Sequence, residues 1–464
     1  MTQKYTEADT EAFYDHEDSM YRSFWDSEGS LHWGYFDNLA DARAQDFVPA
    51  CHRWNEYMLA CSGLTSESRV LDIGCGNGNT AIWLAQQTGC EVVGIDISAV
   101  RVGNANALAQ EYPSLRLSFQ KASVTSLPFS DNSFTHVWSQ ATIYHVHQRE
   151  LALKEIYRVL QEQGIFLFDD LITPVSEISP EGQKHVYQRL LFEPTFSYES
   201  YAKTLREIGL MVLEAKDLSE HLNKSYQLLS ELALSKYPKL SASYDKMCAA
   251  IVARELGWSF YRSQKVSDRL SWIYETNEEK TLQDKYDAWA TIYDADLDEP
   301  YRCSPVQSAK ALANVLPNKA ASILDVGAGT GMVGEALAEL GYTNITAVDL
   351  SEEMLEVARK KQVYTALHQA NVSEALTFST PEAFDGILAV GVFTFGHAHP
   401  QGLRNLFELL KSGGYFVLTL RVDYHESNDS LQEVVQELSW SIIDRVEFNI
   451  FETEPMVALV LKKH

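Results

Sequence analysis

A short glycine-rich motif occurs twice in this chain of 464 residues, and its two copies are flanked by the same kinds of residues. A short, mostly apolar run precedes each copy, and a second apolar run that ends in an acid follows each copy at the same distance. The loop residues that we expect to face a ligand are Gly74, Cys75, Gly76 and Gly78 in the first copy, and Gly327, Ala328, Gly329 and Gly331 in the second. Matched spacing in both copies predicts two α/β modules of the same kind.

The residues around each loop predict a site for a nucleotide-like ligand. Glycines let the chain turn sharply and let a ligand approach the backbone, because they carry no Cβ. The segments that follow, residues 80–87 and 332–340, are predicted helices, which would place a helix N-terminus at the ligand. The second apolar runs end in Asp96 and Asp349. At the carboxyl edge of a doubly wound sheet, such an acid can bind the hydroxyl pair of a ribose.

The spacing of the glycines argues against a dinucleotide, and therefore against a nicotinamide-dependent oxidoreductase. The dinucleotide fingerprint requires a third glycine at positions where this chain has Asn79 and Met332. An acid also precedes each loop by two residues, Asp72 in the first copy and Asp325 in the second. A carboxylate there would repel a pyrophosphate and attract an ammonium group.

The chain repeats its plan with a nearly constant offset. The glycine motifs are 253 residues apart, and the predicted strands that begin at Phe134 and Phe384 are 250 residues apart. Strands alternate with helices in both halves, which predicts a parallel, doubly wound sheet in each. Helical periodicity over residues 174–270 predicts an added helical region in the first half. The boundaries that we expect are 1–275 for the first domain, 276–283 for a linker and 284–464 for the second domain.

The composition favours a globular enzyme that acts on a small molecule. A net charge of −26 would repel nucleic acid and an anionic membrane surface, so we expect neither as a partner. No apolar run approaches the ~18 residues that span a membrane, and the polar N-terminus is unlike a signal peptide. The six cysteines form no C-x-x-C pair, so we expect neither a metal site nor a disulfide framework. We therefore expect a cytoplasmic enzyme and leave its oligomeric state open.

The acid before the loop, the three glycines and the ribose acid together resemble the class I S-adenosylmethionine-dependent methyltransferases. The resemblance implies two Rossmann-like, doubly wound methyltransferase domains, each with one S-adenosylmethionine and with S-adenosylhomocysteine as product. It implies that Asp72 and Asp325 support the methionine end and that Asp96 and Asp349 bind the ribose. The further residues that it assigns to the cofactor are Ile97, Ser123, Gln140, Leu350, Asn371 and Val390.

The first module resembles the sarcosine/dimethylglycine and tocopherol methyltransferase group through residues 19–25, 31–36 and 138–145. This resemblance implies a small amine or amino-acid-derived acceptor. Methylation of oxygen or carbon in a phenolic or prenyl-lipid compound is the alternative. The chain departs from the group at Ser123, where an acid usually meets the adenine amino group, and at Ala141, where the amine enzymes often carry an acid.

The second module resembles the small methyltransferases of the Williams–Beuren-region type. The resemblance rests on residues 286–290, Tyr293, Asp294 and residues 349–355. It implies the fold and the cofactor but no particular acceptor. An alternative is that this module binds S-adenosylmethionine as a regulatory or dimerisation unit without catalysing a reaction.

Methyl transfer from a sulfonium is an in-line displacement, in which the protein supplies alignment and excludes water. An amine acceptor must be neutral and a hydroxyl must lose its proton, so a nearby base can help. The catalytic candidates are His145, Tyr144 and Tyr35 in the first module and His397 in the second. Each histidine could instead fix its loop by hydrogen bonds. His399 follows His397 by two residues, but no third ligand is evident, so we predict no metal.

Aromatic residues gather in the segment that leads into the first module. They are Tyr14, Tyr21, Trp25, Trp33 and Tyr35. Such residues could form a cage for a methylated ammonium through cation–π contacts. The alternative, which we favour, is a hydrophobic lid over the cofactor.

Overall fold

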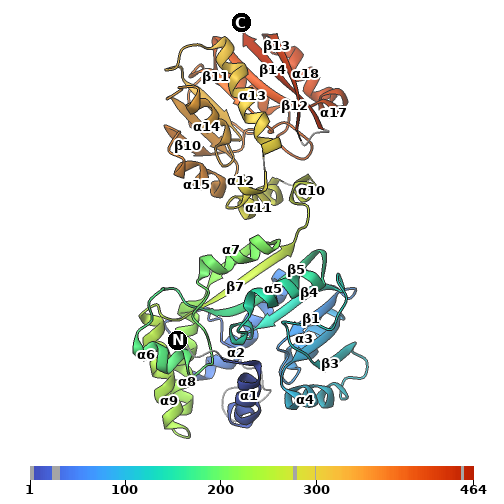
Figure 1. Ribbon diagram of the computed structural model, residues 1–464, viewed down its shortest axis with the longest axis vertical. Helices are drawn as coiled ribbons and strands as arrows, with labels where there is room; N and C mark the ends of the chain where they lie inside the picture. The colour runs from blue at the N-terminus through green and yellow to red at the C-terminus, as the bar shows by residue number, and fades with distance from the viewer. Residues whose placement is uncertain (1–4, 23–31, 275–278, 298, 451–453) are drawn as a thin grey trace. The chain divides into compact units, whose positions relative to one another are not determined.

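The structure is a computed structural model of the chain (Figure 1). The residues that it describes are 5–22, 32–274, 279–297, 299–450 and 454–464. The chain divides into two compact units, residues 1–267 and 268–464, and each is described by itself. The division precedes the predicted linker. Part of that linker is helical, since helix α11 (Glu279–Trp289) begins within it, and helix α10 (Arg269–Tyr274) groups with the second unit.

The first unit is built around a seven-stranded sheet. Its strands are β1 (Arg69–Ile73), β2 (Glu91–Asp96), β3 (Leu117–Lys121), β4 (Phe134–Gln140), β5 (Leu160–Ile172), β6 (Leu210–Asp217) and β7 (Gly257–Lys265). Its helices are α1 (Glu7–Arg22), α2 (Phe47–Ser62), α3 (Asn79–Thr88), α4 (Ala99–Ala109), α5 (Arg149–Val159), α6 (Pro180–Gly182), α7 (Tyr198–Ile208), α8 (Ser219–Ala233) and α9 (Pro238–Val252), with the short turns η1 (Ala44–Asp46), η2 (Ile143–His145) and η3 (Gln183–Tyr187).

The strand order of this sheet is β3-β2-β1-β4-β5-β7-β6. Strands β1 to β5 pair in parallel, and β7 runs antiparallel to both β5 and β6. The predicted parallel sheet is therefore correct for β1 to β5, and of the two remaining strands only β7 is reversed, because β6 pairs antiparallel with β7 and so runs in the direction of β5. Both β6 and β7 lie in the stretch that we assigned to helices. Gly209 ends α7 with a φ of +97°, and β6 begins directly after this stop.

Alternate residues of the parallel strands enter two different cores. Val70 and Val92 pack with residues of α2 and α3, whereas Leu71 and Val93 pack with residues of α5 and α7. Successive side chains of a strand point to opposite faces, so helices cover both faces of the sheet. The carboxyl ends of β1, β2 and β4 meet at one edge, and this edge carries the glycine loop.

The second unit repeats the fold with the equivalent strand order β10-β9-β8-β11-β12-β14-β13. Its strands are β8 (Ile323–Val326), β9 (Ile345–Asp349), β10 (Ala366–Gln369), β11 (Phe384–Ala389), β12 (Leu410–Arg421), β13 (Trp440–Ile450) and β14 (Glu454–Lys463). Its further helices are α12 (Tyr293–Asp296), α13 (Glu299–Val315), α14 (Met332–Glu339), α15 (Glu352–Lys360), α16 (Gly402–Leu409), α17 (Val422–Ser427) and α18 (Asp429–Glu437). The predicted repeat of one fold is confirmed, and here too the last two strands of the order pair antiparallel.

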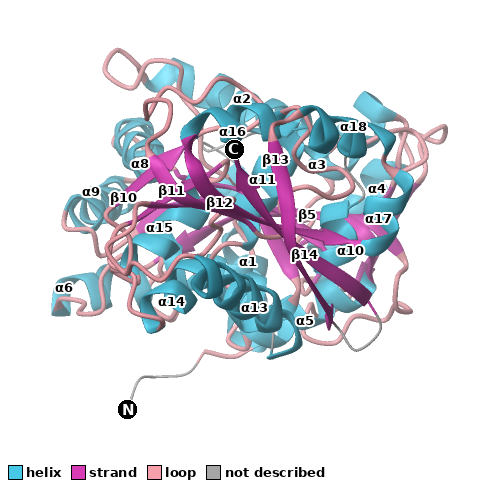
Figure 2. Ribbon diagram, turned by 90° about the horizontal axis from the view of Figure 1, so that it is seen from above, coloured by secondary structure: helices cyan, strands magenta, loops and turns pink. Residues whose placement is uncertain are grey.

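The two units differ in the connection between their last two strands. In the first unit the helices α8 and α9 connect β6 to β7 and lie side by side (Figures 1 and 2). They lie at the end of the sheet opposite β3 (Figure 1). In the second unit only residues 451–453 separate β13 from β14. The added helical region predicted for the first domain is therefore confirmed.

Candidate functional sites

The two glycine loops follow the carboxyl ends of β1 and β8. All six motif glycines have positive φ, between +53° and +93°. A Cβ on Gly74 would lie 2.2 Å from Oγ1 of Thr142, and a Cβ on Gly327 would lie 2.4 Å from Cγ2 of Val392. Both loops therefore require glycine, for backbone conformation and for space.

The predicted ribose acids hold these loops in the same way in both units. Asp96, at the end of β2, accepts hydrogen bonds from the backbone N–H groups of Gly76 at 3.0 Å and Ser98 at 2.8 Å. Asp349 accepts the two equivalent bonds at 2.7 and 2.9 Å. Burial raises the pKa of both carboxyl groups, although these bonds oppose the rise. Each loop is thus fastened to the end of the neighbouring strand.

The acids that precede the loops are deeply buried and incompletely satisfied. Burial raises the pKa of Asp72 and of Asp325 to about 7. Oδ2 of Asp72 has no hydrogen-bond partner within the described part of the chain. In the second unit Oδ2 of Asp325 accepts a bond from the hydroxyl of Tyr364 at 2.6 Å, and Oδ1 has no partner among the described residues. A buried carboxylate oxygen without a donor is costly, and a cationic ligand would satisfy it.

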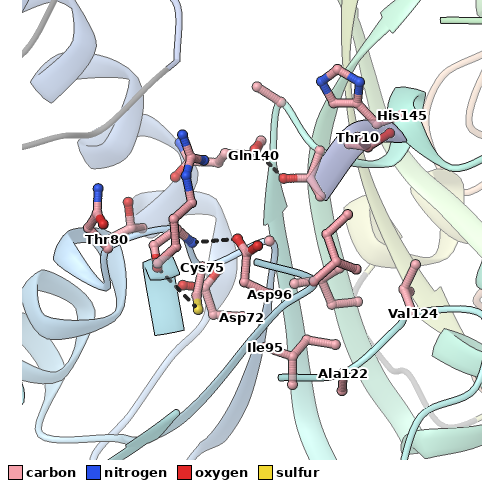
Figure 3. A pocket seen from close by; sticks show the side chains of 18 of the residues that line it. Thr10, Asp72, Cys75, Thr80, Ile95, Asp96, Ala122, Val124, Gln140 and His145 are labelled. Carbon is pink, nitrogen blue, oxygen red and sulfur yellow. Dashed lines mark hydrogen bonds between the residues drawn. The ribbon is translucent and has the colours of Figure 1, made fainter. Parts of the chain in front are cut away.

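A pocket in the first unit joins the ends of β1, β2 and β4 to helix α1 (Figure 3). The predicted site residues that line it are Asp72, Gly74, Cys75, Gly76, Asp96, Ile97, Gln140 and His145. The predicted residues that are not among its lining are Gly78, Ser123, Tyr144 and Tyr35. Lining residues that sequence reasoning missed are Glu7, Thr10, His32 and Arg101. Residues distant in the sequence thus meet in one cavity.

His145 reaches this pocket from η2, directly after β4 (Figure 3). Burial and the guanidinium groups of Arg101 and Arg149 lower its pKa to about 3. The imidazole is therefore neutral at physiological pH. It can accept or donate a hydrogen bond but is a weak general base, since an efficient base has a pKa near the working pH.

The two tyrosine candidates are held by protein contacts outside the pocket lining. The backbone N–H of Tyr144 donates to Asp170 at 2.8 Å, and its ring lies 5.4 Å from that of Phe192. The ring of Tyr35 stacks on His221 of α8 at 4.4 Å. Their catalytic roles stay predictions, because neither side chain borders the cavity that contains His145.

The aromatic lead segment packs on the added helices. Trp33 is 3% exposed, and its ring lies 5.6 Å from that of Trp258. The backbone N–H of Gly34 donates to Ser225 of α8 at 3.0 Å. Such packing suits the predicted hydrophobic lid over the cofactor better than an open aromatic cage. The other members of the predicted cage, Tyr14, Tyr21 and Trp25, lie outside the residues whose side chains the structure describes.

An aspartate that sequence reasoning did not single out organises the loop after β4. Asp169 of β5 is fully buried and accepts bonds from the indoles of Trp54 at 2.8 Å and Trp258 at 2.9 Å. It also accepts a bond from the backbone of Ala141 at 3.1 Å, and this residue has the unusual φ of +49°. Burial raises the pKa of Asp169 to about 6. The sequence feature that could have identified Asp169 is its place beside Asp170, since two adjacent acids are unusual in a strand that is otherwise apolar.

In the second unit both ring nitrogens of His397 are bonded to the protein. Nδ1 lies 2.8 Å from the carbonyl oxygen of Phe395, so Nδ1 carries the hydrogen. Nε2 consequently accepts the hydroxyl of Tyr286 at 2.7 Å. Burial lowers the pKa of His397, which keeps the ring neutral. This arrangement fits a histidine that fixes its loop.

The remaining predicted cofactor residues of the second unit lie at the ends of β9, β10 and β11. Leu350 follows β9, and its carbonyl accepts the side-chain amide of Gln369 at 3.1 Å. Oδ1 of Asn371 accepts the backbone N–H of Ser373 at 2.9 Å. Val390 follows β11 and is partly buried. All three thus border the same sheet edge as the second glycine loop.

Among the described residues, no three His, Cys, Asp or Glu side chains form a group that could hold a metal ion. The six cysteines are free thiols. Of the helices that the structure describes, none is long and apolar enough to cross a membrane.

One protein-family model matches the sequence of this chain twice. The model, described as a methyltransferase domain, matches residues 71–168 and 324–418. Each match begins in the strand before a glycine loop, β1 or β8, and ends in β5 or β12. Both matches therefore contain a loop and the acid bonded to it.

Three similar proteins are named for methylation of different acceptors. The chain is 26% identical, over 57% of its length, to the O-methyltransferase resE of Aspergillus sclerotiorum, which is covered completely. It is 31% identical, over 44% of its length, to 27-O-demethylrifamycin SV methyltransferase of Amycolatopsis mediterranei, of which 74% is covered. It is 30% identical, over 48% of its length, to glycine/sarcosine/dimethylglycine N-methyltransferase of Actinopolyspora halophila, of which 39% is covered. The likeness of the second module to the Williams–Beuren-region type stays a prediction.

Proposed function

Because this chain belongs to the methyltransferase domain family and uses S-adenosylmethionine, we propose that its first module methylates a small amine or amino-acid-derived acceptor and that each module binds its own methyl donor. One observation carries the proposal for the first module. Its pocket joins Asp72 and Asp96, which suit the donor, to the neutral imidazole of His145.

The residues of the first pocket fit S-adenosylmethionine. The bound cofactor supplies a methyl group already activated on a sulfonium. The unpartnered Oδ2 of Asp72 suits the ammonium of the methionine end, and Asp96 lies where a ribose can donate its hydroxyl hydrogens. An ammonium beside Asp72 would favour the ionised carboxylate and so lower its pKa from about 7.

His145 suits the orientation of an acceptor better than the removal of a tightly held proton. With a pKa of about 3 it stays neutral and can accept a hydrogen bond from an amine N–H. A neutral amine needs alignment more than a base, since its lone pair is already available. The runner-up is O- or C-methylation of a phenolic or prenyl-lipid compound, to which the O-methyltransferase relatives lend support.

A second candidate function applies to the second module alone. Both ring nitrogens of His397 are engaged by Phe395 and Tyr286, so this histidine offers no free nitrogen to an acceptor. The observation favours a module that binds S-adenosylmethionine without transferring its methyl group, as a regulatory or dimerisation unit.

Isotope-labelled S-adenosylmethionine tests both proposals. The intact chain is incubated with a mixture of amines, amino acids, thiols and phenols, and mass spectrometry identifies the labelled product. Asp96→Ala and Asp349→Ala, each in the full chain, assign a product to one module. A labelled amine that only Asp96→Ala abolishes supports the proposal. Label in a phenol or another hydroxyl compound would contradict the amine proposal and support O-methylation. A product that only Asp349→Ala abolishes would contradict a non-catalytic second module.

A further inference from the structure

A carboxylate from helix α1 reaches the first pocket beside its apolar wall. Glu7 lines the pocket, as do Ala122 and Val124, which follow the end of β3. Figure 3 shows Ala122, Val124 and Ile95 on one side of the cavity, with Thr10 of the same helix α1 also facing it. Apolar side chains of this kind suit the faces of a purine base, whose edge carries the polar groups.

Ser123, the residue at the position where the resemblance expects an adenine-binding acid, already makes hydrogen bonds within the protein. The resemblance places an acid where this chain has Ser123. Oγ of Ser123 accepts the backbone N–H of Thr125 at 3.1 Å and donates its hydrogen to Oε1 of Glu7. Thr125 donates to the same oxygen at 3.3 Å. Oε2 of Glu7 makes no hydrogen bond within the part of the chain that the structure describes.

We propose that Glu7 supplies the carboxylate that accepts the 6-amino group of adenine, in place of the missing acid at the end of β3. Ser123 and Thr125 hold Oε1, which leaves Oε2 for the ligand. A hydrogen bond to an ionised acceptor is stronger than one to a hydroxyl, so Glu7 restores what Ser123 lacks. The unsatisfied Oδ2 of Asp72, in the same pocket and 3% exposed, independently indicates a ligand there.

Helix α1 is positioned for this role by two further acids. Glu7, Glu11 and Asp15 are spaced by four residues and so lie on one face of the helix. Glu11 pairs with Lys121 at 2.5 Å, and Asp15 accepts the hydroxyl of Ser98 at 2.5 Å. These two contacts fasten the helix to the ends of β3 and β2, whereas Glu7 alone of the three borders the pocket. Glu11 therefore provides a matched control.

The test compares two ligands that differ at one position of the base. S-adenosylhomocysteine carries the 6-amino group, and S-inosylhomocysteine carries an oxygen there, which a carboxylate would repel. Binding is measured by calorimetry to the full chain with Asp349→Ala, which weakens the second site. We expect this parent to prefer the adenine ligand and Glu7→Ala to reduce the preference by roughly tenfold. Glu11→Ala should weaken both ligands equally, because it affects only the docking of α1.

Equal weakening of both ligands by Glu7→Ala would overturn the proposal, since Glu7 would then only fasten the helix. Glu7→Gln keeps its oxygen for the hydroxyls of Ser123 and Thr125 and turns its NH2 toward the ligand, so it should lose the preference for the adenine ligand as Glu7→Ala does. Full retention of the preference in Glu7→Gln would also overturn the proposal. A parent that binds neither ligand would overturn the donor site of the first module itself, and the role of Glu7 with it. This outcome is separate from a failure of the amine proposal, because no acceptor is present.

Discussion

The two modules are alike around the glycine loop and differ around the histidine that follows β4 or β11. Both have the same strand order, glycine loops with positive φ, and an acid that accepts two backbone bonds from loop and cap. They differ in the loop histidine and in the elements after β6 and β13. His145 borders a cavity, whereas His397 is bonded at both nitrogens. The shared part is the part to which we assign the methyl donor in both modules.

The acids before the loops show a subtler difference. Among the described residues each acid has one oxygen without a partner, but only Asp325 accepts a bond from a tyrosine, the hydroxyl of Tyr364, on its other oxygen. That bond opposes the rise in the pKa of Asp325, which burial causes. The second module therefore stabilises its carboxylate before any ligand binds, and the first leaves this to the ligand.

The largest expected effect follows from adding one methyl group to a glycine loop. Gly74→Ala and Gly327→Ala each force a Cβ into a side chain at positive φ, so each should weaken S-adenosylmethionine binding to its own module by roughly 100-fold or more. Calorimetry on the full chain separates the two sites. Gly63→Ala is the control, because its φ is +70° but no atom lies within 4 Å of the added Cβ. If either loop variant affected both sites equally, the modules would not be independent.

A smaller loss should come from removing the charge before the loop. Asp72→Asn and Asp325→Asn keep the size of the side chain but cannot pair with an ammonium. We expect each to weaken donor binding to its module by roughly tenfold to a hundredfold. Equilibrium titration of both variants checks this. An unchanged affinity in Asp72→Asn would remove the methionine end of the donor from this pocket.

Tyr364→Phe should affect the second module only, by roughly threefold at pH 7. Loss of the hydroxyl bond raises the pKa of Asp325 further above about 7, so more of the carboxyl is protonated and the ammonium binds less well. The difference should vanish near pH 9, where the carboxyl is ionised in both proteins. A loss of the same size at pH 9 would show that Tyr364 acts through packing and not through ionisation.

The smallest expected effect is on stability without ligand. The pKa of Asp72 is raised to about 7 in the folded chain, above the usual value near 3.8. Its contribution to the free energy of unfolding is therefore complete below about pH 4 and is lost as the pH rises to about 7. Asp72→Asn lacks this loss, so its Tm relative to wild type should increase by about 2–4 °C between pH 5 and pH 8. Calorimetric scans at both pH values measure it, and a difference in Tm that does not change between them would mean that the carboxyl is ionised throughout.

The parts of the fold that sequence predicted are those encoded locally. The glycine loops, the strands before them and the acids Asp96 and Asp349 each combine a turn signal with an apolar run, and all lie where expected. Strand β7 was missed because it follows a long helical stretch and pairs with β5, which is distant in the sequence. Strand β13 has an exposed, charged pattern, as expected of the edge that it forms.

The pocket was predictable only where its residues belong to the motif. Glu7 and Arg101 enter it from segments without a motif, and their places depend on how those segments pack against the sheet. The placement of the Tyr35 and Tyr144 rings outside the pocket lining could not be predicted for the same reason, since it goes with ring contacts to His221 and Phe192. The sequence shows residue types but not such contacts.

The connection between the last two strands works as an insertion point. A loop costs closure entropy that grows only with the logarithm of its length, so replacing a connection of three residues, the length of 451–453, by one as long as residues 218–256 costs about 2 kcal/mol. Helices α8 and α9 offset this by burying their own apolar faces, and α8 fixes the segment that carries His32. New helices can therefore be inserted at this connection while the sheet edge that carries the glycine loop is left intact, which makes it the natural place to graft α8 and α9 onto the second module.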